Sequence, residues 1–202
     1  MMRVALPIAA AVTALLPTAA PTRAQESRVE AAEVRCPAVL GVGVATDVVF
    51  CDVPIQNEAG RGILVVVPRR RGEATVSFTL HNRHTFSESE TRAGRAYTEY
   101  TAEIAVAALD GRVLGRRFIL SEFRSAGDLV DRVTGGAGPE GVKAVAPTGR
   151  ERVFVSVPEE VDTIAIVGQS LEVVRLDSRE TFRTPGRPVA VISDVEVEYR
   201  AP

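Results

Sequence analysis

Ala74–Asn82 reads ATVSFTLHN, and this stretch decides the fold class because its hydrophobicity alternates with a period of two residues. The apolar set of alternate positions consists of Ala74, Val76, Phe78 and Leu80. The polar set consists of Thr75, Ser77, Thr79 and His81. Successive side chains of a β-strand point to opposite faces of its sheet. The stretch therefore predicts a strand with one buried face and one face open to water, as in antiparallel sheets.

The same alternation recurs along most of the chain after Cys36. Segments that are rich in valine and bounded by Gly, Pro, Asn or Asp are predicted to be strands. They are Val39–Ala45, Asp47–Val53, Gly62–Val67, Ala74–Asn82, Tyr97–Leu109, Arg112–Phe123, Arg152–Val157, Thr163–Val167, Leu171–Leu176 and Pro188–Tyr199. Many short strands separated by turns predict an all-β fold. We expect an antiparallel β-sandwich of immunoglobulin-like or jelly-roll-like architecture.

The dipeptide Asp110-Gly111 predicts a tight turn of two residues between two of these strands. Pairing about that turn places Arg117 opposite Ile104 on the buried face, where an unpaired charge is costly. A β-bulge near Gly115 would shift the alternation by one residue. We therefore expect Phe118 and Leu120 to point inward and Arg117 to point outward.

One short helix is expected over Ala126–Val133. Ser125 is suited to cap its N-terminus, and Asp128 follows three residues later, as in a capping box. The segment Gly135–Gly141 is rich in glycine, and we expect it to form a loop without regular structure.

Composition is that of an ordinary globular chain. The 202 residues are 46% hydrophobic and 25% charged, which argues against wholesale disorder. The formal net charge of -2 provides no basic field for nucleic-acid phosphates, so nucleic acid is not an expected partner. The oligomeric state does not follow from composition.

The N-terminus has the features of a secretory signal peptide over residues 1–24. Arg3 precedes an apolar stretch over Val4–Leu16, and small residues follow it. We expect residues 25–35 to be a flexible leader and residues 36–202 to form a single β-sandwich domain. No later stretch is long and apolar enough for a transmembrane helix. The sequence thus predicts an exported protein that is periplasmic or extracellular.

Cys36 and Cys51 are the two cysteines of the chain. An even number of cysteines in an exported protein predicts a disulfide. We expect a structural Cys36–Cys51 bond because the C-x-x-C spacing of redox-active pairs is absent.

The two histidines, His81 and His84, lie close to Glu88. Two imidazoles and one carboxylate are a ligand set for zinc, and an open coordination position would make the site hydrolytic. Chelation needs a turn, because positions 81 and 84 point to opposite faces of a regular strand. A metal site at these three residues is therefore an alternative interpretation.

Asp194, Glu196 and Glu198 form an acidic stripe on one strand face. Alternate residues lie about 6.5 to 7 Å apart, too far for one calcium ion to gather all three. We interpret the stripe as a solvated face with cross-strand arginine partners.

A polar platform is the main candidate binding surface. It would form if the wet face of Ala74–Asn82 lay beside the wet face of the strand that begins at Tyr97. Its members would be Thr75, Thr79, His81, Tyr97, Glu99 and Thr101, with Arg95 beside them. Tyrosine and arginine are favoured at recognition surfaces, and such a platform suits a glycan or a peptide.

The sequence contains neither G-x-S-x-G nor H-E-x-x-H, and it assigns no catalytic residue. The preferred hypothesis is an exported, non-enzymatic β-sandwich module of a bacterial cell envelope that binds a protein partner or a glycan and needs no cofactor. Two alternatives remain open. One is a metal-assisted hydrolase that uses His81, His84 and Glu88, and the other is a structural subunit that assembles by strand addition.

Overall fold

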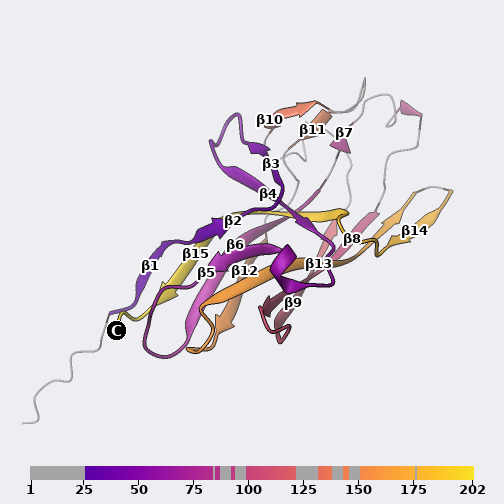
Figure 1. The fold of residues 1–202 in the computed structure, drawn as a ribbon. Helices are drawn as coiled ribbons and strands as arrows, with labels where there is room; N and C mark the ends of the chain where they lie inside the picture. The colour runs from indigo at the N-terminus through magenta and orange to yellow at the C-terminus, as the bar shows by residue number, and fades with distance from the viewer. Residues whose placement is uncertain are drawn as a thin grey trace, which may run out of the picture.

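The computed structural model describes residues 26–83, 85–86, 92–93, 99–121, 132–137, 143–145, 151–175 and 177–202. Two six-stranded antiparallel sheets form most of this part of the chain, and their inner faces pack against each other (Figure 1). The prediction of an all-β antiparallel sandwich is confirmed.

Sheet 1 has the strand order β12-β6-β15-β4-β3, and β1 pairs with the far end of β15. Its strands are β1 (Arg28–Ala31), β3 (Val39–Val42), β4 (Val49–Pro54), β6 (Ala74–Asn82), β12 (Glu151–Val157) and β15 (Pro188–Tyr199). The long β15 therefore has β6 along one side and first β4, then β1, along the other.

Sheet 2 has the strand order β2-β5-β13-β8-β9, and β14 pairs with β13. Its strands are β2 (Glu33–Arg35), β5 (Ile63–Val66), β8 (Glu99–Ala108), β9 (Val113–Ser121), β13 (Thr163–Val174) and β14 (Arg179–Phe182). Sheet 3 is small and has the order β10-β11-β7, with β7 (Thr85–Phe86), β10 (Arg132–Ala137) and β11 (Lys143–Val145). A 3₁₀ turn, η1, covers Ala59–Arg61.

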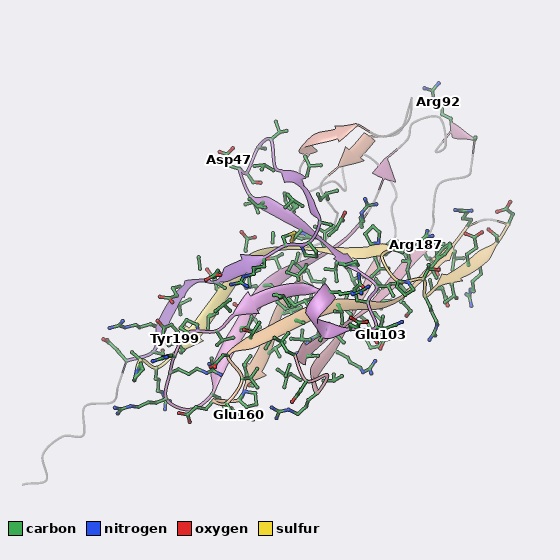
Figure 2. The ribbon with its side chains drawn as sticks, in the orientation of Figure 1. Asp47, Arg92, Glu103, Glu160, Arg187 and Tyr199 are labelled. Carbon is green, nitrogen blue, oxygen red and sulfur yellow. A yellow bond between two sulfur atoms is a disulfide. The ribbon has the colours of Figure 1, made fainter. Side chains whose placement is uncertain are left out.

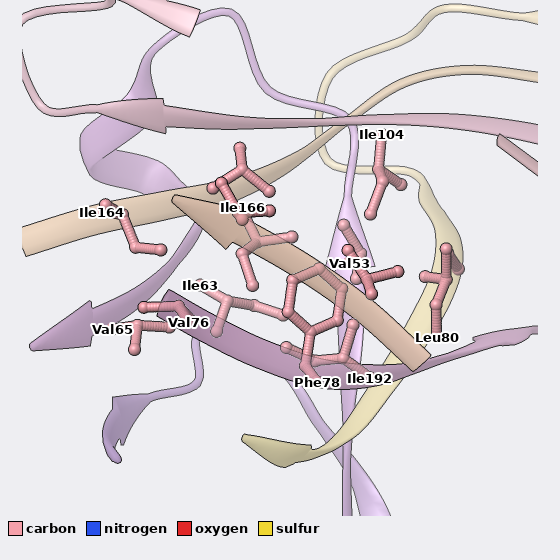
Figure 3. Packing of buried hydrophobic residues seen from close by; sticks show 14 of the residues in the cluster. Val53, Ile63, Val65, Val76, Phe78, Leu80, Ile104, Ile164, Ile166 and Ile192 are labelled. Carbon is pink, nitrogen blue, oxygen red and sulfur yellow. The ribbon is translucent and has the colours of Figure 1, made fainter. Parts of the chain in front are cut away.

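The core lies between sheets 1 and 2 and consists of alternate residues from both. Val76, Phe78 and Leu80 of β6 have no exposed surface, as the sequence predicted (Figure 3). Ile164 and Ile166 of β13 belong to the same cluster from the opposite sheet. Burial of these side chains is the main driving force for association of the two sheets.

The hairpin between β8 and β9 differs from the prediction. Ala108 N donates to Arg112 O at 2.9 Å, so the turn contains three residues rather than two. The expected bulge is present, because Ala107 pairs with Val113 whereas Val106 pairs with Gly115. The extra turn residue and the bulge compensate each other, and the strands return to the register of a two-residue turn.

The outcome for Arg117 is a correction. It pairs with Ile104 after all, whereas Phe118 and Leu120 are 54% and 74% exposed and point outward. Arg117 avoids burial because β9 is an edge strand. Its Nη2 donates to the carbonyl of Phe154 in β12 at 2.8 Å and so bridges the open side of the sandwich.

Residues 28–31 and 33–35, which we expected to belong to a flexible leader, form strands. β1 pairs with β15 in sheet 1, and β2 pairs with β5 in sheet 2. The chain changes sheets at Ala32, whose N donates to Val195 O at 2.9 Å. These two short strands form because β15 and β5 offer free edges with which they can pair. The local sequence does not show that such edges lie nearby.

The Cys36–Cys51 disulfide is confirmed, with Cα atoms 6.0 Å apart. Cys36 directly follows β2 and Cys51 belongs to β4, so the bond ties the edge of sheet 2 to sheet 1. A structural disulfide is typical of proteins that fold in an oxidising compartment, and it points to export.

Sheet 3 corrects two local predictions. Arg132 and Val133, expected at the end of a helix, lie in β10. Gly135, Gly136 and Ala137, expected in a loop, belong to the same strand. The remaining parts of the predicted helix and loop, like the predicted signal peptide, lie outside the described residues. Within the described part of the chain, no helix is long and apolar enough to span a membrane.

Candidate functional site

The outer face of sheet 1 carries a group of mostly polar side chains that the strand register brings together. We call it the polar face. It comprises Thr75, Ser77 and Thr79 of β6, Arg152, Phe154 and Ser156 of β12, and Ser193, Glu196 and Glu198 of β15. On β6 and β12 they occupy alternate positions, and on β15 the bulge between Ser193 and Glu196 adds one residue.

Arg152 connects the three strands of this face. Its guanidinium donates to Ser77 Oγ at 2.7 Å, to Thr79 Oγ1 at 3.4 Å and to the backbone oxygen of Asp194 at 2.5 Å. It also forms an ion pair with Glu196. Glu196 of the acidic stripe therefore has a cross-strand arginine partner of the kind that we expected. Because its donors are fixed by three strands, Arg152 is preorganised.

Phe154 lies two residues from Arg152 on the same face. It pairs with Ser77 in the register, and it is 59% exposed. A large aromatic side chain held open on a polar sheet face is available to a ligand. The alternation of residues 152–157 shows that Arg152 and Phe154 share a face, but it does not show which strand lies beside them. The sequence reasoning therefore missed both residues.

A polar pocket of about 500 Å³ lies at one end of the polar face. It is lined by Ser27, Arg71, Gly72, Glu73, Thr75, Glu198, Tyr199 and Arg200. Thr75 and Glu198 belong to both the pocket and the face, so the two are continuous. Tyr199, labelled in Figure 2, donates from its hydroxyl to Glu30 Oε1 at 3.2 Å.

The other end of the outer face is covered. Val133 of β10 packs on Phe50 and Val191, and the Phe50 ring contacts the His81 ring edge-on with centroids 5.5 Å apart. His81 is consequently only 2% exposed.

His81 begins a chain of hydrogen bonds. Its Nε2 lies 2.9 Å from Ser193 Oγ, which donates to Asp194 Oδ2 at 2.9 Å. Since the serine has one proton, Nε2 must be the donor in the first bond. Ser193 is as buried as His81. The order is His–Ser–Asp, whereas a hydrolytic triad needs the acid to bond the histidine.

A partly buried ion pair lies beside the covered end. Arg83 Nε donates to Asp52 Oδ1 at 2.8 Å. Desolvation raises the pKa of Asp52, and Arg83 opposes that shift through its charge and its hydrogen bond. The sequence offered no signal for this pair because Asp52 in β4 and Arg83, which follows β6, are 31 positions apart along the chain.

The structure separates the members of the predicted platform. Thr79 and His81 lie on β6 in sheet 1, whereas Glu99 lies on β8 in sheet 2. Arg95 and Tyr97 lie outside the described residues, as do His84 and Glu88 of the alternative metal site. Among residues that the structure describes, no group of three or more His, Cys, Asp or Glu side chains is placed to hold a metal ion.

Comparisons with known proteins do not place the chain in a family. No model of a protein family matches the chain, and no curated protein matches its sequence. Among solved structures, the K1 cleaved adhesin domain of Lys-gingipain from Porphyromonas gingivalis W83 is 10% identical, with 88% of this chain and 99% of that chain covered and a TM-score of 0.37. A likeness this weak says nothing of what the present chain binds.

Proposed function

We propose that this protein is an exported, non-enzymatic module of a bacterial cell envelope that binds a glycan on its polar face. The observation that carries the proposal is the continuity between the polar pocket and a face that exposes Phe154 beside Arg152. A flat face that opens into a pocket offers one surface to several sugar units.

The side chains match the chemistry of a sugar ring. A pyranose has an apolar face of C–H groups, which packs on an aromatic ring such as that of Phe154. Its rim carries hydroxyls, each both a donor and an acceptor. Ser156 and Thr75 provide hydroxyls of the same kind, and the exposed Glu198 provides an acceptor carboxylate.

The size of the pocket also fits. Small-ligand pockets occupy roughly 300 to 1,000 Å³, and the polar pocket measures about 500 Å³. Its charged residues have both signs, Arg71 and Arg200 with Glu73 and Glu198, which suits a neutral ligand with many hydrogen bonds better than a strongly charged one.

The test is thermal unfolding of the purified protein against a panel of envelope glycans. A ligand at 100 times its Kd stabilises the protein by about 2.7 kcal/mol, which corresponds to a rise in Tm of about 5 to 10 °C for a chain of this size. Phe154→Ala should weaken binding about tenfold.

Phe118→Ala is the matched control because Phe118 is similarly exposed but lies on sheet 2. It should leave the affinity unchanged. If no glycan raises the Tm, or if the two variants lose glycan affinity equally, a glycan site on the polar face is contradicted.

Strand addition is a second candidate function, favoured by the edge strand β9. Phe118 and Leu120 project from it into solvent. Exposed apolar residues on an edge strand are a ready surface for pairing with another chain. Sedimentation equilibrium should then show multimers that Leu120→Lys dissolves and that Val29→Lys, on the exposed edge strand β1, leaves intact. A monomer at all concentrations would exclude self-assembly.

A further inference from the structure

A second pocket lies on the opposite side of β15 from the polar face's main strands β6 and β12. Along this side, pairing with β4 reaches Ile192, and pairing with β1 begins at Glu196. Between them β4 turns away with β3, and the chain crosses from sheet 1 to sheet 2 at Ala32. A pocket of about 470 Å³ fills the resulting gap.

The walls of this gap pocket are mostly aliphatic. Val34, Val48, Val49, Ile192 and Val195 line it together with both cysteines of the disulfide. Ser193 and Asp194 are the polar residues among its lining. The pocket therefore combines an apolar body with one acidic group.

The carboxylate of Asp194 is held in a defined position. Its backbone has a positive φ of 50° at the bulge of β15, where β15 is out of register with β6. Ser193 donates to Oδ2, and His81 in turn donates to Ser193, so the orientation of the carboxylate is fixed from the buried side. Arg152 bonds the backbone oxygen of Asp194 rather than its carboxylate.

Within the described residues, no arginine or lysine nitrogen lies within 4.0 Å of the Asp194 carboxylate in an ion pair. It therefore offers a negative charge at the wall of an apolar pocket. An ion of opposite charge with an aliphatic body complements both features.

We propose that the gap pocket binds a small aliphatic primary amine in its ammonium form. The alkyl chain lies among the valines, and the ammonium group donates to the Asp194 carboxylate. An alkyl carboxylate is repelled by the same group, and a neutral alcohol gains the apolar contact without the charge. This site is separate from the glycan site and does not depend on it.

The experiment is an NMR titration of the ¹⁵N-labelled protein with 1-aminohexane, 1-hexanol and hexanoate at pH 7. Hexylammonium should bind saturably and shift amides of residues 192–195, about fivefold tighter than hexanol because the ion pair is partly exposed. Hexanoate should bind weakest.

Asp194→Asn keeps the size of the side chain and tolerates the positive φ, since asparagine adopts this conformation readily. It should abolish the preference for hexylammonium over hexanol. A preference that survives in this variant would overturn the assignment of Asp194. The absence of saturation by hexylammonium would overturn the site.

Ala31→Phe places a ring at the wall of the pocket and should block binding, whereas Val29→Phe, on the same strand and outside the pocket, should not. Equal binding by these two variants would contradict the location. N-acetyl-lysine methylamide represents a lysine side chain of a partner protein. If it binds more tightly than hexylammonium, the ligand is such a lysine rather than a free amine, and that part of the proposal is overturned.

Phe154→Ala separates the two sites. It should leave hexylammonium binding unchanged, whatever its effect on glycans, so each proposal can fail without the other.

Discussion

The two sheets have outer faces of different character, although each exposes a phenylalanine to a similar degree. Phe154 on sheet 1 lies beside a guanidinium that bonds residues of two other strands, β6 and β15. Phe118 on sheet 2 lies opposite Glu103, whose partner is Arg116 at 2.6 Å. Exposure alone therefore does not identify a binding residue. What distinguishes Phe154 is a fixed set of polar neighbours and a pocket that continues its face.

Farther across sheet 2, the outer face is closed by the chain itself. Ala165 and Val167 of β13 point outward but are buried, and η1 lies over them. A Cβ at Gly62 would approach Val167 Cγ1 to 2.4 Å, so only glycine permits this close contact. On sheet 1 the cover reaches only the His81 end of the outer face, and Phe154 and Ser156 of β12 stay exposed.

Loss of the Cys36–Cys51 disulfide, which joins the two sheets, should have the largest effect on the free energy of unfolding. The variant Cys36→Ser/Cys51→Ser opens a loop with a sequence separation of 15 residues, and it should lower the free energy of unfolding by about 3 kcal/mol. The protein has no tryptophan, so Phe154→Trp and Phe118→Trp provide one fluorescent probe on each sheet.

Urea unfolding followed by these two probes tests whether the faces belong to one cooperative unit. Coincident transitions are expected with the disulfide intact, as for a two-state protein. Separate midpoints would show that the two outer faces are stabilised independently.

Replacement of the arginine that lies near each exposed phenylalanine should have an intermediate effect on the free energy of unfolding. Arg152→Met removes an ion pair and hydrogen bonds to two neighbouring strands, β6 and β15, and it should cost about 1 to 2 kcal/mol. Arg116 is more exposed than Arg152 and forms an ion pair with Glu103, so Arg116→Met should cost no more than about 0.5 kcal/mol. Chemical denaturation measures both, and equal losses would remove the proposed difference between the faces.

The smallest effect concerns the covered end of sheet 1, where burial raises the pKa of Asp52 above its ordinary value. As pH rises through about 3.9, the unfolded chain releases this proton before the folded protein does. Wild type should therefore lose stability relative to Asp52→Asn from that pH up to the folded pKa, and the difference should then become constant.

Denaturation curves of the two proteins between pH 3 and pH 7 measure this difference. Ser156→Ala, which removes no titratable group from the polar face, is the control. A difference of the opposite sign would mean that Arg83, rather than desolvation, dominates at Asp52.

Local alternation predicted most strands and the inner face of β6, because the period of two reports burial directly. It did not predict which strands are neighbours. Thr79 and Glu99 were expected on one platform but lie on different sheets, since pairing between distant segments leaves no local signature. The predicted orientation of Phe118 was wrong for a different reason. The face to which Phe118 points depends on both the number of residues in the turn and the bulge, and the sequence revealed only the bulge.

The position of the two ends has a mechanical consequence. Arg28 pairs with Tyr199, so both ends of the described chain lie side by side (Figure 1). A force that separates them would peel β1 from β15 one residue pair at a time, a geometry that resists weakly because the hydrogen bonds break in sequence. The peel would pass Ala32 and remove β2, and it would then stop at Cys36, where a covalent bond to β4 takes up the load. The disulfide thus limits how far this protein can be extended from its N-terminal side before the core is reached.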